Sequence, residues 1–256
     1  MLGKLLKYEV KATSMTFLLL YIVILAFSVC NKAFMSFDFE WGIIITGMIL
    51  FTLFMALGVI TLIVVIQRFN KNLLGDEGYL MFTLPVKTRD LVTSKILVAF
   101  MWTILSCIVA VVAFLILAIG NIDWTVNPQV NWQELFTLIE QEVQKEFNMN
   151  TISLMISLIV AMVGGYAQFI LMIYASLSIA QFPKFNKHRI MTAFGAFIVL
   201  STIIDNILPA ILSLVVDFNN ISVKAGIISG NIFLIITDIL LFIGINKILS
   251  KHLNLE

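Results

Sequence analysis

Six long apolar runs, each free or nearly free of charged residues, divide this chain. They cover residues 12–31, 41–67, 96–122, 147–183, 190–216 and 225–246. A helix rises 1.5 Å per residue, so roughly 20 apolar residues cross a hydrocarbon layer about 30 Å thick. Backbone in lipid must satisfy its own amides, which only a helix does within one segment. We therefore expect an all-α integral membrane protein with transmembrane helices at about 14–31, 42–66, 96–120, 151–180, 190–216 and 226–246.

Two alternatives would change this count. The first run follows a basic leader, as in a cleaved signal peptide, but its best cleavage site at Ala26-Phe27-Ser28 is weak. The fourth run is long, but polar edges trim it to about 30 residues, short of the roughly 40 that two crossings need. Gly164-Gly165 then indicates a kink or a close packing point within one tilted helix. We expect six uncleaved spans.

Basic residues fall in alternate gaps between the runs. Thirteen of the 16 Lys and Arg residues lie before the first run, between the second and third, between the fourth and fifth, or after the sixth. Only Lys32, Lys145 and Lys224 remain for the opposite side, where acidic residues gather. Because Lys and Arg are retained in the cytoplasm, we expect both termini to be cytoplasmic in a bacterial cell membrane. The formal net charge of +1 hides this asymmetry.

Composition excludes a soluble protein. Hydrophobic residues make up 61% of the chain and charged residues 12%, more apolar surface than a soluble domain of this size could bury. No internal repeat or separate soluble domain is evident, so we expect a single transmembrane domain over residues 1–256. Contact with the lipid bilayer is implied, and nothing suggests binding to nucleic acid.

Two segments outside the spans have helical periodicity. Leader residues 1–13 place leucines on one face and lysines on another, which is typical of an amphipathic helix along the inner leaflet; a basic tail that only directs insertion explains the pattern equally well. The extracellular segment 121–150 places apolar residues at helical spacing between acids. It predicts an interfacial helix with tryptophan anchors.

The gap between the second and third spans, residues 67–94, is the most informative one. The second helix can continue to Gly75, a residue type that commonly ends helices. Acidic and glycine residues follow, and then four apolar residues stand in a loop expected to face water: Tyr79, Leu80, Met81 and Phe82. Such a patch is typical of a docking site. An interfacial turn that dips into the inner leaflet explains it equally well.

The stretch RFNKNLLGDEGYLMFTLPVKTRDLVTSK at positions 68–95 resembles the cytoplasmic loop of small ABC-2 type permeases. These are six-helix membrane subunits of ATP-binding-cassette exporters, common in Firmicutes, with a fold of the type V exporter kind. The specific part is GDEGYLMFTLP at 75–85, and the whole match covers about a ninth of the chain. One departure is that the gap between spans 5 and 6 is only about residues 217–224, whereas many family members place extracellular helices there.

The resemblance implies an ATPase-coupling role for the loop, seated in a groove of a partner. The residues that would make this contact are Gly75, Asp76, Glu77, Gly78, Tyr79, Leu80, Met81, Phe82 and Pro85. The chain has no G-x-x-x-x-G-K-[ST] phosphate loop, so ATP and Mg²⁺ are expected on a separate cytoplasmic ATPase dimer and no cofactor on this chain. Six helices form only half of the translocation pathway that such exporters usually have. The resemblance therefore implies a second permease copy or a sister permease.

Two acids within the spans are candidates for the translocation pathway. Asp205 and Asp238 would each cost several kcal/mol in lipid unless wet, paired or protonated. A hydrogen-bonded acid that ties helices together is an equally good explanation. Pro209 follows Asp205 by four residues and weakens that helix.

Small residues recur every fourth position in the fourth and sixth spans, which predicts close helix packing within or between subunits. They are Ser153, Ser157, Ala161, Gly165, Gly226 and Gly230. No His or Cys spacing suggests a metal site, and no triad suggests an enzyme. We therefore expect a permease that exports an amphipathic or hydrophobic cargo: a bacteriocin-like peptide, a lipid or a drug. The alternatives are a proton-coupled secondary transporter that uses the two aspartates, and a non-transporting membrane scaffold or sensor.

Overall fold

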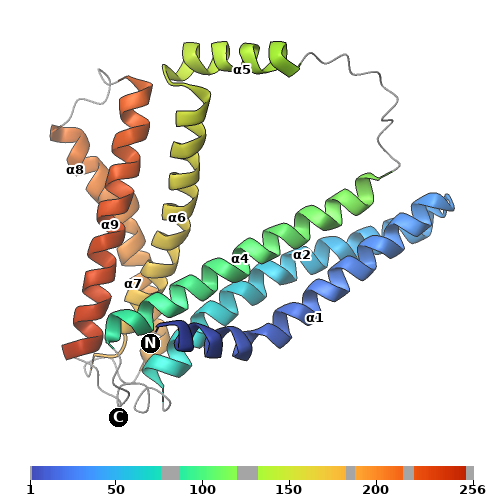
Figure 1. The fold of residues 1–256 in the computed structure, drawn as a ribbon. Coiled ribbons are helices and arrows are strands. Elements are labelled where there is room, and N and C mark those ends of the chain that lie inside the picture. The colour runs from blue at the N-terminus through green and yellow to red at the C-terminus, as the bar shows by residue number, and fades with distance from the viewer. Residues whose placement is uncertain (1, 76–86, 120–131, 183–187, 216–221, 252–256) are drawn as a thin grey trace. The chain divides into compact units, whose positions relative to one another are not determined.

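The computed structural model describes residues 2–75, 87–119, 132–182, 188–215 and 222–251 (Figure 1). Within these ranges the chain is all-helical, without a strand. Six helices are long and apolar enough to cross a membrane: Leu2–Ser36, Glu40–Leu74, Thr88–Ala118, Thr151–Ile179, Arg189–Ile211 and Val223–Ser250. The predicted all-α class with six membrane-spanning candidates is confirmed. By their contacts the described residues form two compact units, 1–127 and 128–256, and each is described by itself below.

The first unit is a three-helix assembly. It contains α1 (Leu2–Ser36), α2 (Glu40–Phe69), the π-helical turn η1 (Asn70–Leu74) and α4 (Thr88–Ala118). The three long helices run side by side (Figure 1), and α1 packs against both others. The leader is therefore part of α1, where Lys4, Lys7 and Lys11 are exposed.

A Schellman motif ends α1 and turns the chain into α2. The backbone N–H of Phe39 donates to Phe34 O at 3.1 Å, and that of Asp38 donates to Met35 O at 3.3 Å. Asp38 has a φ of 51°, the left-handed conformation that this motif requires. The Phe34 and Phe39 rings lie 5.6 Å apart and supply its apolar contact. A Cβ on Gly42 would collide with both rings, so only glycine fits below them.

The core of the first unit follows one stripe of α1. The buried residues of this helix are Glu9, Thr13, Phe17, Tyr21, Ile24, Ser28 and Asn31, at spacings of three and four. This is the period at which side chains of a helix share one face. Phe17 stacks on Trp102 of α4 with ring centroids 4.5 Å apart and planes 10° from parallel. Far along the stripe, the Asn31 amide donates to Ile43 O at 3.0 Å and to Thr46 Oγ1 at 2.7 Å.

The second unit combines three spans and a short amphipathic helix. It contains α5 (Trp132–Phe147), α6 (Thr151–Ile179), α7 (Arg189–Thr202), the π-helical turn η3 (Ile203–Ile207), α8 (Leu208–Val215) and α9 (Val223–Lys251). Helix α6 packs against α7 and α9, while α5 lies crosswise at the end of α6 (Figure 1). The helix predicted within residues 121–150 is thus present as α5, with Phe136 and Leu138 exposed.

The fifth span is interrupted where the sequence contains Pro209. Proline has no N–H to donate to the carbonyl of Asp205, four residues earlier. The backbone hydrogen bonds of the helix change spacing just before Pro209. The N–H of Leu208 donates to Ile203 O, five residues back, which produces the π-helical turn η3. Asp205 lies within this turn and is exposed.

Candidate functional site

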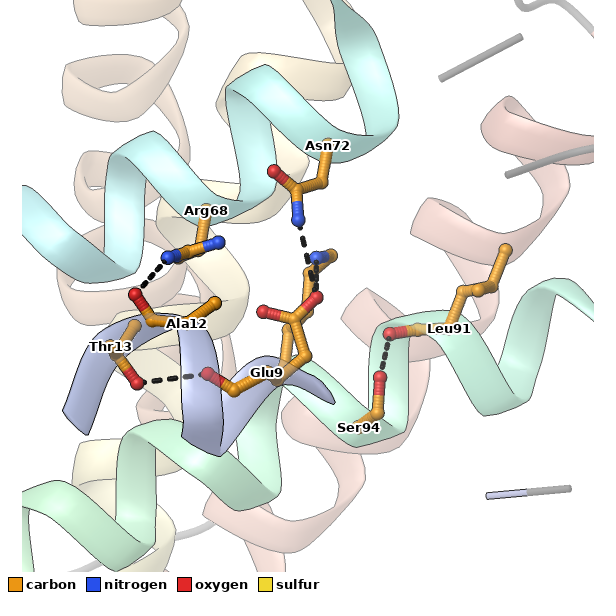
Figure 2. Close-up of polar contacts among 8 residues, drawn as sticks. Glu9, Ala12, Thr13, Arg68, Asn72, Leu91 and Ser94 are labelled. Carbon is orange, nitrogen blue, oxygen red and sulfur yellow. Dashed lines mark hydrogen bonds and ion pairs between the residues drawn. The ribbon is translucent and has the colours of Figure 1, made fainter. Parts of the chain in front are cut away.

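A buried ion pair and one further hydrogen bond join three helical elements of the first unit, namely α1, η1 and α4. Nζ of Lys95 on α4 lies 2.7 Å from Oε1 of Glu9 on α1. The same oxygen accepts a bond of 3.3 Å from Nδ2 of Asn72 in η1. Figure 2 shows the Asn72 amide pointing at the Glu9 carboxylate. We call Glu9, Asn72 and Lys95 the Glu9 cluster.

Burial makes this cluster energetically sensitive. The Lys95 side chain is 2% exposed and that of Glu9 7%. Two ions removed from water lose several kcal/mol each in hydration, and only close pairing with further hydrogen bonds offsets that loss. Removal of one partner would leave a buried unpaired charge and would cost about 3–5 kcal/mol. The two residues therefore depend on each other.

A second set of bonds joins the backbone of α1 to its neighbours. Arg68, near the end of α2, donates from Nη2 to Ala12 O at 2.6 Å (Figure 2). Thr13 donates from Oγ1 to Glu9 O at 2.9 Å and accepts from Nε1 of Trp102 at 2.8 Å. One turn of α1 is thus bonded to both α2 and α4.

The π-helical turn η1 positions Asn72. A π turn holds more residues than an α turn and occurs often at functional sites. In η1 three consecutive side chains, those of Asn72, Leu73 and Leu74, are buried. The turn leads directly to Gly75, which ends the described part of this segment with an extended ψ of −167°.

Sequence reasoning missed the Glu9 cluster. Lys95 was counted only as a residue that directs topology, and Glu9 as part of a basic leader. A signal was present: Glu9, Thr13, Phe17 and Tyr21 recur every four residues, so the acid continues the apolar face of the first span. An acid on that face must be paired, hydrogen-bonded or protonated, so a buried partner on a neighbouring helix could have been sought.

The expected coupling residues are described only at their edge. Gly75 follows η1, and a Cβ there would lie 3.0 Å from Lys71 O, so glycine relieves a close contact. The remaining eight lie outside the described residues: Asp76, Glu77, Gly78, Tyr79, Leu80, Met81, Phe82 and Pro85. Of the Glu9 cluster, Asn72 precedes this segment in the sequence and Lys95 follows it.

The two membrane aspartates differ in environment. Asp205 is exposed in η3, whereas Asp238 on α9 is half-buried, and its Oδ1 is buried without a hydrogen-bond partner among the described residues. Its neighbour Thr237 instead accepts a bond of 3.0 Å from Nε2 of Gln168 on α6. Thr237 also lines an apolar cavity of about 290 Å³ walled by α6, α7, η3, α8 and α9. This cavity could accommodate a small apolar group.

The small residues of α6 and α9 differ in how closely they approach neighbours. A Cβ on Gly164 would collide with the Leu234 side chain of α9, while one on Gly165, Gly226 or Gly230 would meet nothing within 4 Å. Ser157 is buried, and its carbonyl accepts a bond of 3.1 Å from Asn231 Nδ2. The other two expected positions, Ser153 and Ala161, are half-buried. The closest glycine approach between α6 and α9 is therefore at Gly164.

The comparisons leave the chain without a named relative. It matches no family model, no curated protein and no solved structure. Among the described residues, no group of three His, Cys, Asp or Glu side chains could hold a metal ion. What can be said of function therefore depends on this chain's own sequence and geometry.

Proposed function

We propose that this chain is the membrane-spanning permease subunit of an ATP-binding-cassette exporter of the ABC-2 type. It would lie in a bacterial cell membrane with both termini cytoplasmic and move an amphipathic or hydrophobic cargo outward. A separate ATPase dimer would bind ATP and Mg²⁺ and dock on the 75–85 loop. A second permease copy or a sister permease would complete the pathway.

The observation that carries this proposal is the Glu9 cluster, which joins a residue that precedes that loop in the sequence, Asn72, to one that follows it, Lys95. A docking loop transmits force only if its two ends are attached to the membrane helices. Here the chain before the loop reaches Glu9 through Asn72, and the chain after it reaches Glu9 through Lys95. The basic residues on the same side of the expected spans and the similarity of positions 68–95 to the family's loop support the same function.

The test is co-purification from native membranes in mild detergent through a tag on this chain. We expect an ATP-hydrolysing partner with a phosphate-loop sequence to co-purify. Replacement of Tyr79, Leu80, Met81 and Phe82 by serine should abolish its recovery. The matched control replaces four other apolar residues by serine, namely Leu135, Phe136, Leu138 and Ile139 of α5, all exposed. It should leave recovery unchanged; equal recovery from both variants would refute docking at this loop.

One observation favours a second candidate, proton-coupled transport. The buried Oδ1 of Asp238 has no hydrogen-bond partner among the described residues, and buried acids in spans mark proton and ion pathways. Transport that persists without ATP and is abolished by Asp238→Asn would favour this function. Transport that requires ATP and survives Asp238→Asn would exclude it.

A further inference from the structure

The Glu9 cluster joins three helical elements at a high cost in hydration free energy. Buried ion pairs lose hydration, and well-packed apolar residues of similar volume often replace them with equal or greater stability. Glu9 and Lys95 are nevertheless both nearly fully buried beside a hydrophobic core that α1, α2 and α4 form in the first unit. Stability alone therefore does not explain why a charged pair stands here.

A hydrogen-bonded ion pair differs from apolar packing because it fixes the direction in which two helices face each other. Apolar side chains tolerate rotation and sliding of one helix against another, whereas a hydrogen-bonded ion pair requires particular atoms to meet. Buried polar groups that set the register of packed helices are the best-attested use of such pairs. Oε1 of Glu9 meets donors from two elements at once, Lys95 at 2.7 Å and Asn72 at 3.3 Å. The carboxylate thus specifies where α1 stands relative to both η1 and α4.

The register set at Glu9 continues along α1 and α4. Thr13 accepts from Trp102, Phe17 stacks on the same indole, and the Tyr21 hydroxyl lies 2.8 Å from Ser106 Oγ. Tyr21 also donates to Trp102 O at 3.2 Å. From Lys95 to Ser106 is eleven residues, or about 16 Å of helix. A displacement at the loop would therefore move α1 and α4 together over this length.

We infer that Glu9, with Lys95 and Asn72, sets the helix register through which movement of the 75–85 loop reaches α1 and α4. Glu9 is thus a positioning residue of the transport cycle, a role that rests on the proposed function. The register itself is a property of this chain and is testable without a partner.

The decisive variant replaces the ion pair by an apolar pair, Glu9→Met with Lys95→Met. Spin labels on cysteines placed at Lys7 of α1 and Ile104 of α4, both exposed, report the register in a background with Cys30 and Cys107 replaced. We expect a thermal midpoint equal to or above that of the native chain and a distance distribution that broadens or shifts. The charge-swapped pair Glu9→Lys with Lys95→Glu should retain the native distribution. A folded Met pair with the native distribution would overturn the inference.

A milder variant keeps the test decisive if the Met pair does not fold. Asn72→Leu leaves the ion pair in place and removes only the bond to η1. With labels at Lys7 and at Ile63 of α2, also exposed, this variant should broaden the distance between α1 and α2. The Lys7–Ile104 distance should stay native. An unchanged Lys7–Ile63 distribution would contradict a register role for Asn72 and with it the three-element contact.

The functional test uses the complex of this chain with its ATPase, purified through the tag on this chain. The Met pair should co-purify the ATPase in native amount but show several-fold altered vanadate-sensitive ATP hydrolysis, because the docked loop no longer positions α1. Native hydrolysis in the Met pair would overturn the coupling role. If no ATPase co-purifies even with the native chain, the proposed function fails, while the spin-label result still decides whether Glu9 sets the register.

Discussion

The neighbouring glycines of α6 provide a sharp test of helix packing, since only one of them is close to another helix. A Cβ at Gly164 collides with the Leu234 side chain of α9, and a Cβ at Gly165 meets nothing within 4 Å. Replacement of glycine by alanine in a helix interior contributes about 1 kcal/mol in favour of the folded state. This gain is common to both positions. Overpacking applies only at Gly164, and its cost should lie near the low end of the usual range, about 1 kcal/mol, because the obstructing atom is a terminal methyl group of Leu234 that can rotate away.

The difference between the two variants therefore isolates the packing cost. Gly165→Ala should be as stable as the native protein or more so, and Gly164→Ala should be less stable than Gly165→Ala by about 1 kcal/mol. For a chain of this size that difference corresponds to roughly 2–4 °C in the thermal midpoint. The assay is thermal unfolding of the detergent-solubilised protein, followed by tryptophan fluorescence.

A third variant identifies the cause. If the collision with Leu234 destabilises Gly164→Ala, then adding Leu234→Ala should recover part of the loss, because the obstructing methyl groups are removed. In Gly165→Ala the same second substitution should only destabilise. Equal midpoints for the two glycine variants, or a lower midpoint for Gly165→Ala, would refute the packing of α6 on α9 described here.

Three further substitutions test separate features by the same assay. Asp38→Gly places glycine at the left-handed position that ends α1 and should raise the thermal midpoint, because glycine has no Cβ to strain that conformation; a lower midpoint would argue against the Schellman motif. Asn31→Ala removes the bonds to Ile43 O and Thr46 and should cost about 0.6–1.7 kcal/mol, whereas no loss would argue against the α1–α2 contact at Asn31. Asp238→Leu removes a buried oxygen without a described partner and should stabilise by about 1–3 kcal/mol; destabilisation would reveal a partner.

Periodicity and charge predicted the six helices because these properties are local to each segment. A run of about 20 apolar residues has one solution in lipid, and each described span follows from its own composition. The break in the fifth span was also predictable, since Pro209 removes a donor wherever it stands in a helix. Amphipathic α5 followed from its spacing of apolar and acidic residues.

The contacts between helices could not be predicted in the same way, because they depend on which faces meet. The four-residue ridge of small residues pointed to Gly165, yet it is Gly164 that faces Leu234. Both glycines look alike in the sequence, and only the rotation of α6 against α9 distinguishes them. Likewise, nothing local pairs Glu9 with Lys95, which stands 86 residues further along the chain.

The sidedness of the membrane tests the central claim most directly, because an ATPase in the cytoplasm can reach the 75–85 loop only from inside. In a background with Cys30 and Cys107 replaced, single cysteines at Leu80 and at Gln141 of α5 are exposed to a membrane-impermeant maleimide. The account predicts labelling of Gln141→Cys in intact cells, and of Leu80→Cys only after the membrane is permeabilised. Labelling of Leu80→Cys in intact cells would contradict the orientation and the proposed coupling to a cytoplasmic ATPase.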